Sequence, residues 1–134
     1  MISEKIRLRM LELHISQREL SRELGIEYTA LNTFLNGRKG MWYERIQKIL
    51  LYVGLTAEGS VTSGRMQPIR DAVWLESRIQ RKTLRALSRD TGIAYGNLVG
   101  FVHGRCGMSH RNVEMLMEKL DIKLVRYDRY GEDR

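Results

Sequence analysis

The sequence predicts an all-α protein made of two tandem copies of one helical unit. Three observations support this: a single proline in 134 residues, apolar residues at helical spacing, and an internal repeat. Residues 20–55 align on residues 87–122 without a gap, with 12 identities in 36 positions. In the first copy the identical residues are Leu20, Ser21, Arg22, Gly25, Ile26, Tyr28, Leu31, Phe34, Gly37, Arg38, Gly40 and Met41. They fall mostly at predicted core, turn and cap positions, which indicates duplication of one fold.

The first copy is expected to contain four helices. Apolar residues at helical spacing indicate the first, namely Ile6, Met10 and Leu13. Ser16 is predicted to cap the second helix, with Glu19 reaching back to complete a capping box. Gly25 is expected to end that helix, because a left-handed backbone costs glycine least. The third helix is predicted from about Tyr28 to Asn36 and the fourth from about Trp42 to Val53.

The second copy repeats this scheme. Its first helix is predicted from about Pro68 to Ile79, since proline suits a first helical turn. Thr83 is expected to cap the second helix, and Gly92 to end it. The third is predicted over Tyr95 to His103 and the fourth over about His110 to Leu120.

These patterns divide the chain into a first domain over 1–55, a linker over 56–67 rich in Gly, Ser and Thr, and a divergent second domain over 68–134 that includes a C-terminal tail. A unit of about 60 residues is marginally stable alone, so the two are expected to pack as a pseudo-dimer. A short strand is possible after each fourth helix, and the two strands are expected to pair and join the halves.

Composition favours a soluble globular protein with a polyanionic partner. The apolar fraction is 43%, the charged fraction 29% and the net charge +7. Both halves are basic, with 10 basic and 7 acidic residues in 1–66 and 13 and 9 in 67–134. A basic balance of this kind favours nucleic acid.

The expected compartment is the cytoplasm. The single cysteine, Cys106, excludes an internal disulfide and suits a reducing environment. The charged start of the chain has no signal-peptide core, and no stretch approaches 18 apolar residues, so no membrane segment is expected.

A helix, a glycine turn and a second helix at this spacing form the helix-turn-helix pattern. The second helix of such a pair must stand clear of the body to enter a DNA major groove about 12 Å wide. Ser21 and Ser88 are expected near the helix crossing, where a large side chain would hold the helices apart. Leu20, Ile26, Leu31 and Phe34 are predicted to fix the angle from beneath.

The segment SQRELSRELGIEYTALNTFLNGRKG, residues 16–40, resembles the helix-turn-helix of lambda-repressor-like and Cro-like regulators, the Xre family. The resemblance covers residues 2–55 and, more distantly, 68–123. The resemblance rests on four features: the glutamine after the cap, the Leu-Ser pair in the second helix, the Gly-Ile turn and the closing Asn-Gly. The resemblance implies a sequence-specific binder of double-stranded DNA, usually dimeric, that controls transcription.

Family contacts carried over onto the first copy give a candidate interface. Gln17 matches a position that contacts backbone phosphate, and Arg18 lies beside it. The face that meets bases and nearby phosphates corresponds to Tyr28, Thr29, Asn32 and Thr33. Asn36 matches a phosphate contact, and Arg38 and Lys39 are cations in the next loop.

The second copy departs from the family pattern. Leu84 stands where Gln17 does, and Gly96, Val99 and Gly100 replace polar groove-facing residues. Base reading there is expected to be weak, with Val99 offering a contact only to a thymine methyl. The remaining candidate DNA contacts are Arg81, Lys82, Arg85, Tyr95, His103, Arg105 and Arg111.

Several readings stay open or are disfavoured. Tyr28 and Tyr95 suit either groove contact or packing on the preceding helix. His103, Cys106 and His110 are possible zinc ligands, but the first copy has Asn36, Lys39 and Tyr43 there, so no metal is expected. No catalytic motif appears, so neither an enzyme nor a cofactor is expected.

The expected function is transcriptional repression by a fused pair that places two recognition helices on one DNA site. The main alternative is an interaction module or antitoxin-like protein, in which one domain binds DNA and the other a protein partner. An inhibitor of a host protein with this fold is a third possibility. The sequence also leaves open whether the chain forms a homodimer.

Overall fold

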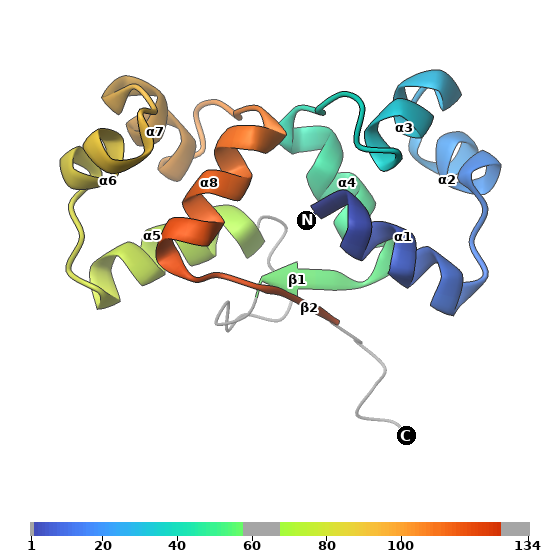
Figure 1. Cartoon of the computed structure of the whole chain (residues 1–134), viewed down its shortest axis with the longest axis horizontal. Helices are drawn as coiled ribbons and strands as arrows, with labels where there is room; N and C mark the ends of the chain where they lie inside the picture. Colours follow the sequence, from blue (N-terminus) through green and yellow to red (C-terminus); the bar gives the residue numbers. More distant parts are fainter. Residues whose placement is uncertain (1, 58–67, 127–134) are drawn as a thin grey trace.

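The computed structural model describes residues 2–57 and 68–126, and this part of the chain is mostly helical (Figure 1). Its elements, in order, are α1 (Ile2–Leu13), α2 (Gln17–Leu24), α3 (Tyr28–Leu35), α4 (Tyr43–Val53), β1 (Leu55–Ala57), α5 (Pro68–Ile79), α6 (Leu84–Thr91), α7 (Tyr95–Val102), α8 (His110–Leu120) and β2 (Leu124–Arg126). Both halves therefore show the same order of four helices and one strand. None of the described helices has the length and apolarity needed to cross a membrane.

The predicted N-cap bonds are present at the second helix of each half, but the Glu19 carboxylate of the predicted capping box bonds to Tyr52. Ser16 Oγ accepts from the backbone N–H of Glu19, and Thr83 Oγ1 accepts from that of Ala86, each at 3.0 Å. Gly25 and Gly92 end these helices with left-handed φ angles of 67° and 80°. The Glu19 carboxylate accepts a hydrogen bond from the Tyr52 hydroxyl at 2.9 Å, and this bond raises the pKa of Tyr52.

The inward face of α1 differs from the expectation at one position. Ile2, Ile6 and Met10 are buried, but Leu13 is 40% exposed. Arg9 is buried instead, and its Nε donates to the backbone oxygen of Val53 at 2.7 Å. That carbonyl lies at the C-terminal end of α4, where a cation is favourable. Because Arg9 already lies at the end of α4, Leu13 one turn later has no part of that helix to pack on.

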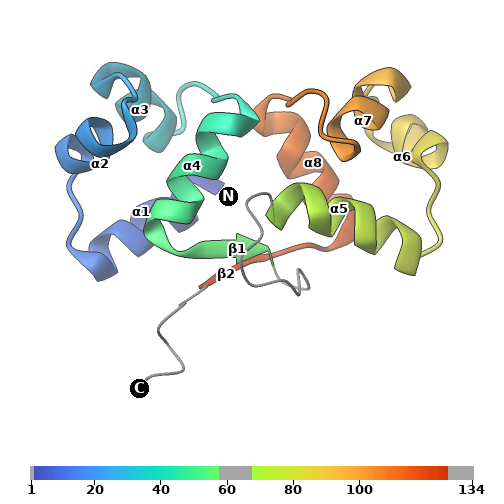
Figure 2. The same ribbon diagram turned by 180° about the vertical axis from the view of Figure 1, so that it is seen from behind.

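The two halves meet along α4 and α8 at the centre of the molecule (Figures 1 and 2). The expected strand pair is confirmed: β1 and β2 are antiparallel, with Ala57 opposite Leu124. At the other end of the contact Trp42 and Ser109 form an isolated bridge. Each of these pairs joins positions that are equivalent in the repeat, as an approximate two-fold axis between the halves requires.

The strand β1 crosses the domain boundary predicted at residue 55. Residues 58–67 of the predicted linker and residues 127–134 of the predicted tail lie outside the described part of the chain. The buried apolar residues of both halves belong to one cluster, so the described halves share a core.

Aromatic contacts are exchanged between the halves. The ring of Phe34 in α3 meets His110 at the start of α8 edge to face, with centroids 5.8 Å apart. The equivalent pair, Phe101 and Tyr43, has centroids 4.8 Å apart. Tyr43 is fully buried, which raises the pKa of its hydroxyl, and this hydroxyl donates to Gln47 Oε1 at 3.1 Å.

Candidate nucleic-acid interface

The helix pairs α2–α3 and α6–α7 lie at opposite ends of the long axis and along the same edge (Figures 1 and 2). The strands β1 and β2 lie at the opposite edge. The candidate site is built on these two helix pairs, because they carry most of the residues that the sequence places at a DNA surface. Any ligand that spans the edge would meet both pairs.

Each helix pair is held at its turn by the same serine bond. Ser21 Oγ donates to the backbone oxygen of Ile26, and Ser88 Oγ donates to that of Ile93, at 2.5 and 2.6 Å. The sequence indicated these serines only as small residues at a crossing. The signal for the hydroxyl bond is that both copies retain serine where alanine would be equally small.

Tyr28 and Tyr95 each stack with an arginine of the preceding helix. The Arg18 guanidinium lies 5.2 Å from the Tyr28 ring centroid, and that of Arg85 lies 4.5 Å from the Tyr95 ring. The two tyrosines remain 39% and 40% exposed. The tyrosines thus pack on the preceding helix and also leave part of each ring at the surface, which combines the two interpretations left open by the sequence.

The outer face of α3 carries polar groups that interact with one another. Asn36 Nδ2 donates to Asn32 Oδ1 at 2.5 Å, which engages the carbonyl of Asn32 and not its amide nitrogen. Thr33 Oγ1 is 3.0–3.1 Å from the backbone oxygens of Thr29 and Ala30. Thr29 and Asn36 are exposed, whereas Asn32 and Thr33 are half-buried. These bonds restrict the side-chain rotamers of Asn32, Thr33 and Asn36.

Residues flanking α3 are placed differently from one another. Arg38 and Lys39 are exposed in the loop that follows Gly37, whose φ is 76°. Gln17, the first residue of α2, is half-buried, and its Oε1 is enclosed without a hydrogen-bond partner among the described residues. Gln17 is therefore less accessible than Asn36, Arg38 and Lys39, the other predicted phosphate contacts of the first half.

On the corresponding face of α7, one of the two glycines is covered by a side chain from the loop that follows the helix. Gly100 is buried, and a Cβ added there would lie only 2.6 Å from Cys106 Sγ. The thiol thus fills the space beside the glycine, and the expectation that Gly100 faces a groove is wrong. In the first half these positions are Thr33 and Lys39. Val99 is half-buried, and only Gly96 is an exposed glycine of this helix.

Most cations predicted for the second half are at the surface. Arg81, Arg85, Arg105 and Arg111 are exposed, as is His103. Lys82 is half-buried, and its Nζ donates to the backbone oxygen of Lys119 at 3.2 Å, near the C-terminus of α8. Lys82 therefore stabilises a helix end, which makes it less available to a phosphate than the arginines.

The three possible zinc ligands are separated by their packing. The ring of His110 lies edge to face against Phe34, Cys106 lies against Gly100, and His103 is exposed. Over residues 2–57 and 68–126, no three His, Cys, Asp or Glu side chains are grouped closely enough to hold a metal ion. Searches of family models, curated proteins and solved structures find no match to this chain.

Proposed function

We propose that the chain is a sequence-specific transcriptional regulator, acting as a repressor, that binds double-stranded DNA through two fused helix-turn-helix units. The observation that carries this proposal is the placement of α2–α3 and α6–α7 along one edge of the molecule (Figure 1). Two recognition helices on one face suit successive major grooves, which lie about 34–36 Å apart. The net charge of +7 gives the phosphate backbone a favourable partner.

In this proposal α3 is the helix that reads bases. Asn32 is suited to adenine, because an amide can donate to and accept from the purine edge at once. Its bond with Asn36 orients the carboxamide in advance and leaves the amide nitrogen and the second lone pair of Oδ1 for a base. Thr29 contributes an exposed hydroxyl and methyl group to the same face. Arg38 and Lys39 are placed to contact phosphate.

The second unit is proposed to contact the phosphate backbone of the DNA more than the bases. Its exposed cations include Arg105 and Arg111, while Val99 offers only an apolar contact. Phosphate contacts fix position and orientation without specifying bases. The preferred DNA site is then asymmetric, with one strongly specified half and one weakly specified half.

A second candidate function follows from the same asymmetry. Exposed Tyr95 and Asn97 keep hydrogen-bonding groups on α7, but Val99 and the buried Gly100 stand where α3 has Asn32 and Thr33. This loss favours a protein partner for this half, as in the antitoxin-like alternative. In that case the second unit would make no contribution to DNA affinity. The two candidates differ in the number of half-sites they require.

Selection of bound sequences from random DNA tests the proposal. We expect an enriched motif with one strong and one weak half-site; a motif with a single half-site and no flanking requirement supports the protein-partner function instead. Affinity should fall roughly 10³–10⁵-fold between 50 and 200 mM salt, as for proteins with about 6–10 phosphate contacts. No enrichment together with a salt-independent affinity would refute DNA binding.

A further inference from the structure

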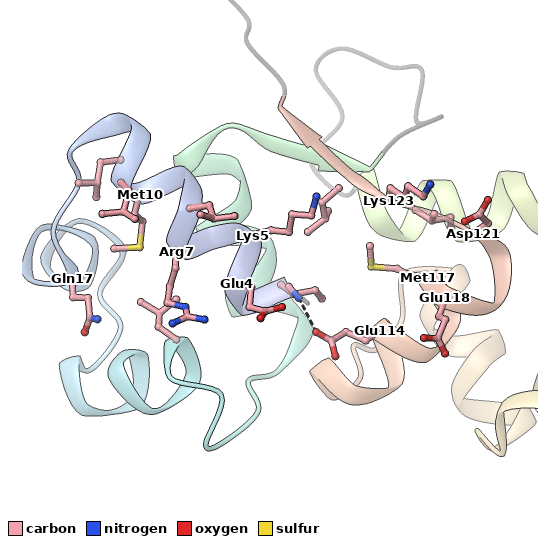
Figure 3. A pocket seen from close by; sticks show the side chains of 17 residues that line it. Glu4, Lys5, Arg7, Met10, Gln17, Glu114, Met117, Glu118, Asp121 and Lys123 are labelled. Atoms are coloured by element: carbon pink, nitrogen blue, oxygen red, sulfur yellow. Dashed lines mark hydrogen bonds between the residues drawn. The ribbon is translucent and has the colours of Figure 1, made fainter.

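A groove runs between α1 and α8 on one flank of the molecule, beside β2 (Figure 3). Its volume is about 1070 Å³. Its lining is largely apolar, and the residues that matter here are Leu8, Met10, Leu11, Met117, Ile122 and Leu124. The groove joins an N-terminal helix of the first half to the last helix of the second half, so it exists only because the halves are packed together.

The wall of the groove formed by α1 carries solvent-exposed leucines. On α1, Leu8 is 60% exposed and Leu11 is 72% exposed. Leucines this exposed on neighbouring turns form an apolar ridge directly beside an apolar groove. Such contiguous apolar surface is typical of an interaction site.

The corresponding flank of the other half differs from this one at two positions. There α5 packs directly on β1. The positions equivalent to Leu11 and Ile15 are Arg78 and Lys82, whereas Leu8 corresponds to the half-buried Leu75. The first half therefore has apolar residues at two positions of this flank where the second half has cations.

The charges around the groove select the kind of occupant. Three basic residues line it, Lys5, Arg7 and Lys123, and four acidic ones, Glu4, Glu114, Glu118 and Asp121. The chain as a whole carries +7, so this flank is depleted of positive charge. A polyanion would bind elsewhere, whereas another copy of the chain would meet no net repulsion at this surface.

The arrangement of these charges is also self-complementary. Arg7 lies toward the α1 end of the groove and Glu118 toward the α8 end (Figure 3). A two-fold axis placed midway between these two residues would bring Arg7 of one copy opposite Glu118 of the other. In such a pair the ridge of Leu8 and Leu11 would face the second copy's α8 wall, where Met117 and Ile122 line the groove.

We propose that this groove is the interface of a homodimer, in which the α1 ridge of each chain inserts into the groove of a second copy. The contact is isologous, because the same surface is used twice. Of the α2–α3 pair only Gln17 and Leu35 line the groove, so dimerisation leaves most of the edge that carries α3 and α7 free in both chains (Figure 1). The proposal stands whether or not that edge binds DNA.

Sedimentation equilibrium of the purified chain over a range of concentrations tests this interface. We expect a concentration-dependent mass that approaches twice the chain mass of 15.7 kDa. Leu11→Arg, which introduces the residue type that the second half carries as Arg78, and Leu8→Arg should each weaken self-association at least about tenfold. Ile79→Arg is the matched control, since Ile79 is 63% exposed on α5 away from the groove, and it should have no effect.

A charge exchange provides a second test that a folding defect cannot imitate. Arg7→Glu and Glu118→Arg should each weaken the dimer, and the double variant should recover most of the loss. Thermal melts should show all variants folded, since both side chains are exposed. A wild-type chain that stays monomeric, or a dimer that resists Leu8→Arg and Leu11→Arg, overturns the proposal and leaves the groove to a different protein or ligand.

Discussion

Helices α3 and α7 occupy equivalent places in two halves of one chain, yet their surfaces differ. Helix α3 presents Asn32, already bonded to Asn36, whereas α7 presents Val99 at the position equivalent to Asn32. The turns that hold the two helices are the same, down to the serine bonds of Ser21 and Ser88. The scaffold has been kept while the presented chemistry has diverged, which is what a fused pair permits and a symmetric homodimer does not.

The largest difference between the halves is expected in the core, where the two equivalent aromatic pairs are buried to different extents. Tyr43 is fully buried against Phe101 and carries hydrogen bonds, while its equivalent His110 is half-buried against Phe34. We expect Tyr43→Ala to lower the free energy of unfolding by about 3–5 kcal/mol. His110→Ala should lower it by only about 1 kcal/mol. Urea unfolding of both variants measures the difference, and equal losses would show that the two contacts are equivalent after all.

The next largest difference is expected in base discrimination. Asn32→Ala should remove about 1–3 kcal/mol of preference at one base pair, because a bidentate contact is lost. Val99→Ala, at the equivalent position, should change the preference little. Affinities for single-base variants of the selected site give the answer. A shift with Val99→Ala as large as with Asn32→Ala would mean that α7 reads bases directly.

Phosphate contacts should be alike in the two halves, because both loops keep an exposed arginine. Arg38→Ala and Arg105→Ala alter equivalent positions. Each should weaken binding about equally on all sequences and reduce the salt slope by about 1. Salt titrations of both variants check this. If only Arg38→Ala changes the slope, the second half does not touch DNA and the protein-partner function is favoured.

The smallest effect concerns the thiol that covers α7. Gly100→Ala should push the Cys106 side chain outward, since the new Cβ and Sγ cannot both be accommodated at 2.6 Å. The thiol is able to rotate, so the stability should change by no more than about 1 kcal/mol. The rate of Cys106 alkylation should rise several-fold. As a control, Gly96→Ala has open space around the added Cβ and should leave that rate unchanged.

Local signals in the sequence predicted the elements well. The bounds expected for α5 and α8 match the structure, and so do the caps at Ser16 and Thr83. These features depend on neighbouring residues along the chain, where turn chemistry and helical spacing act directly. Pairing of the two strands was also predicted, because equivalent segments follow the fourth helix of each copy; the structure adds that the pair is antiparallel.

Features that depend on distant neighbours were missed or misjudged. Leu13 has the right spacing for burial but lies past the end of α4. Helical spacing along one segment does not reveal how long the helix packed against it is. Gly100 was taken for a bare groove position, although Cys106 covers it from the following loop. The groove between α1 and α8 brings together residues more than 100 positions apart, so no local sequence pattern predicts it.

The strand pair also has a consequence for the order in which the chain folds during synthesis on the ribosome. β1 is made early, but its partner begins at Leu124, so the edge of β1 waits while α5 to α8 are synthesised. Phe34 likewise waits for His110. N-terminal segments of a nascent chain generally fold first, and unpaired strand edges are prone to wrong partners. The first half is thus the part of a nascent chain that most needs protection, and slow translation of the second half should lower the yield of folded protein.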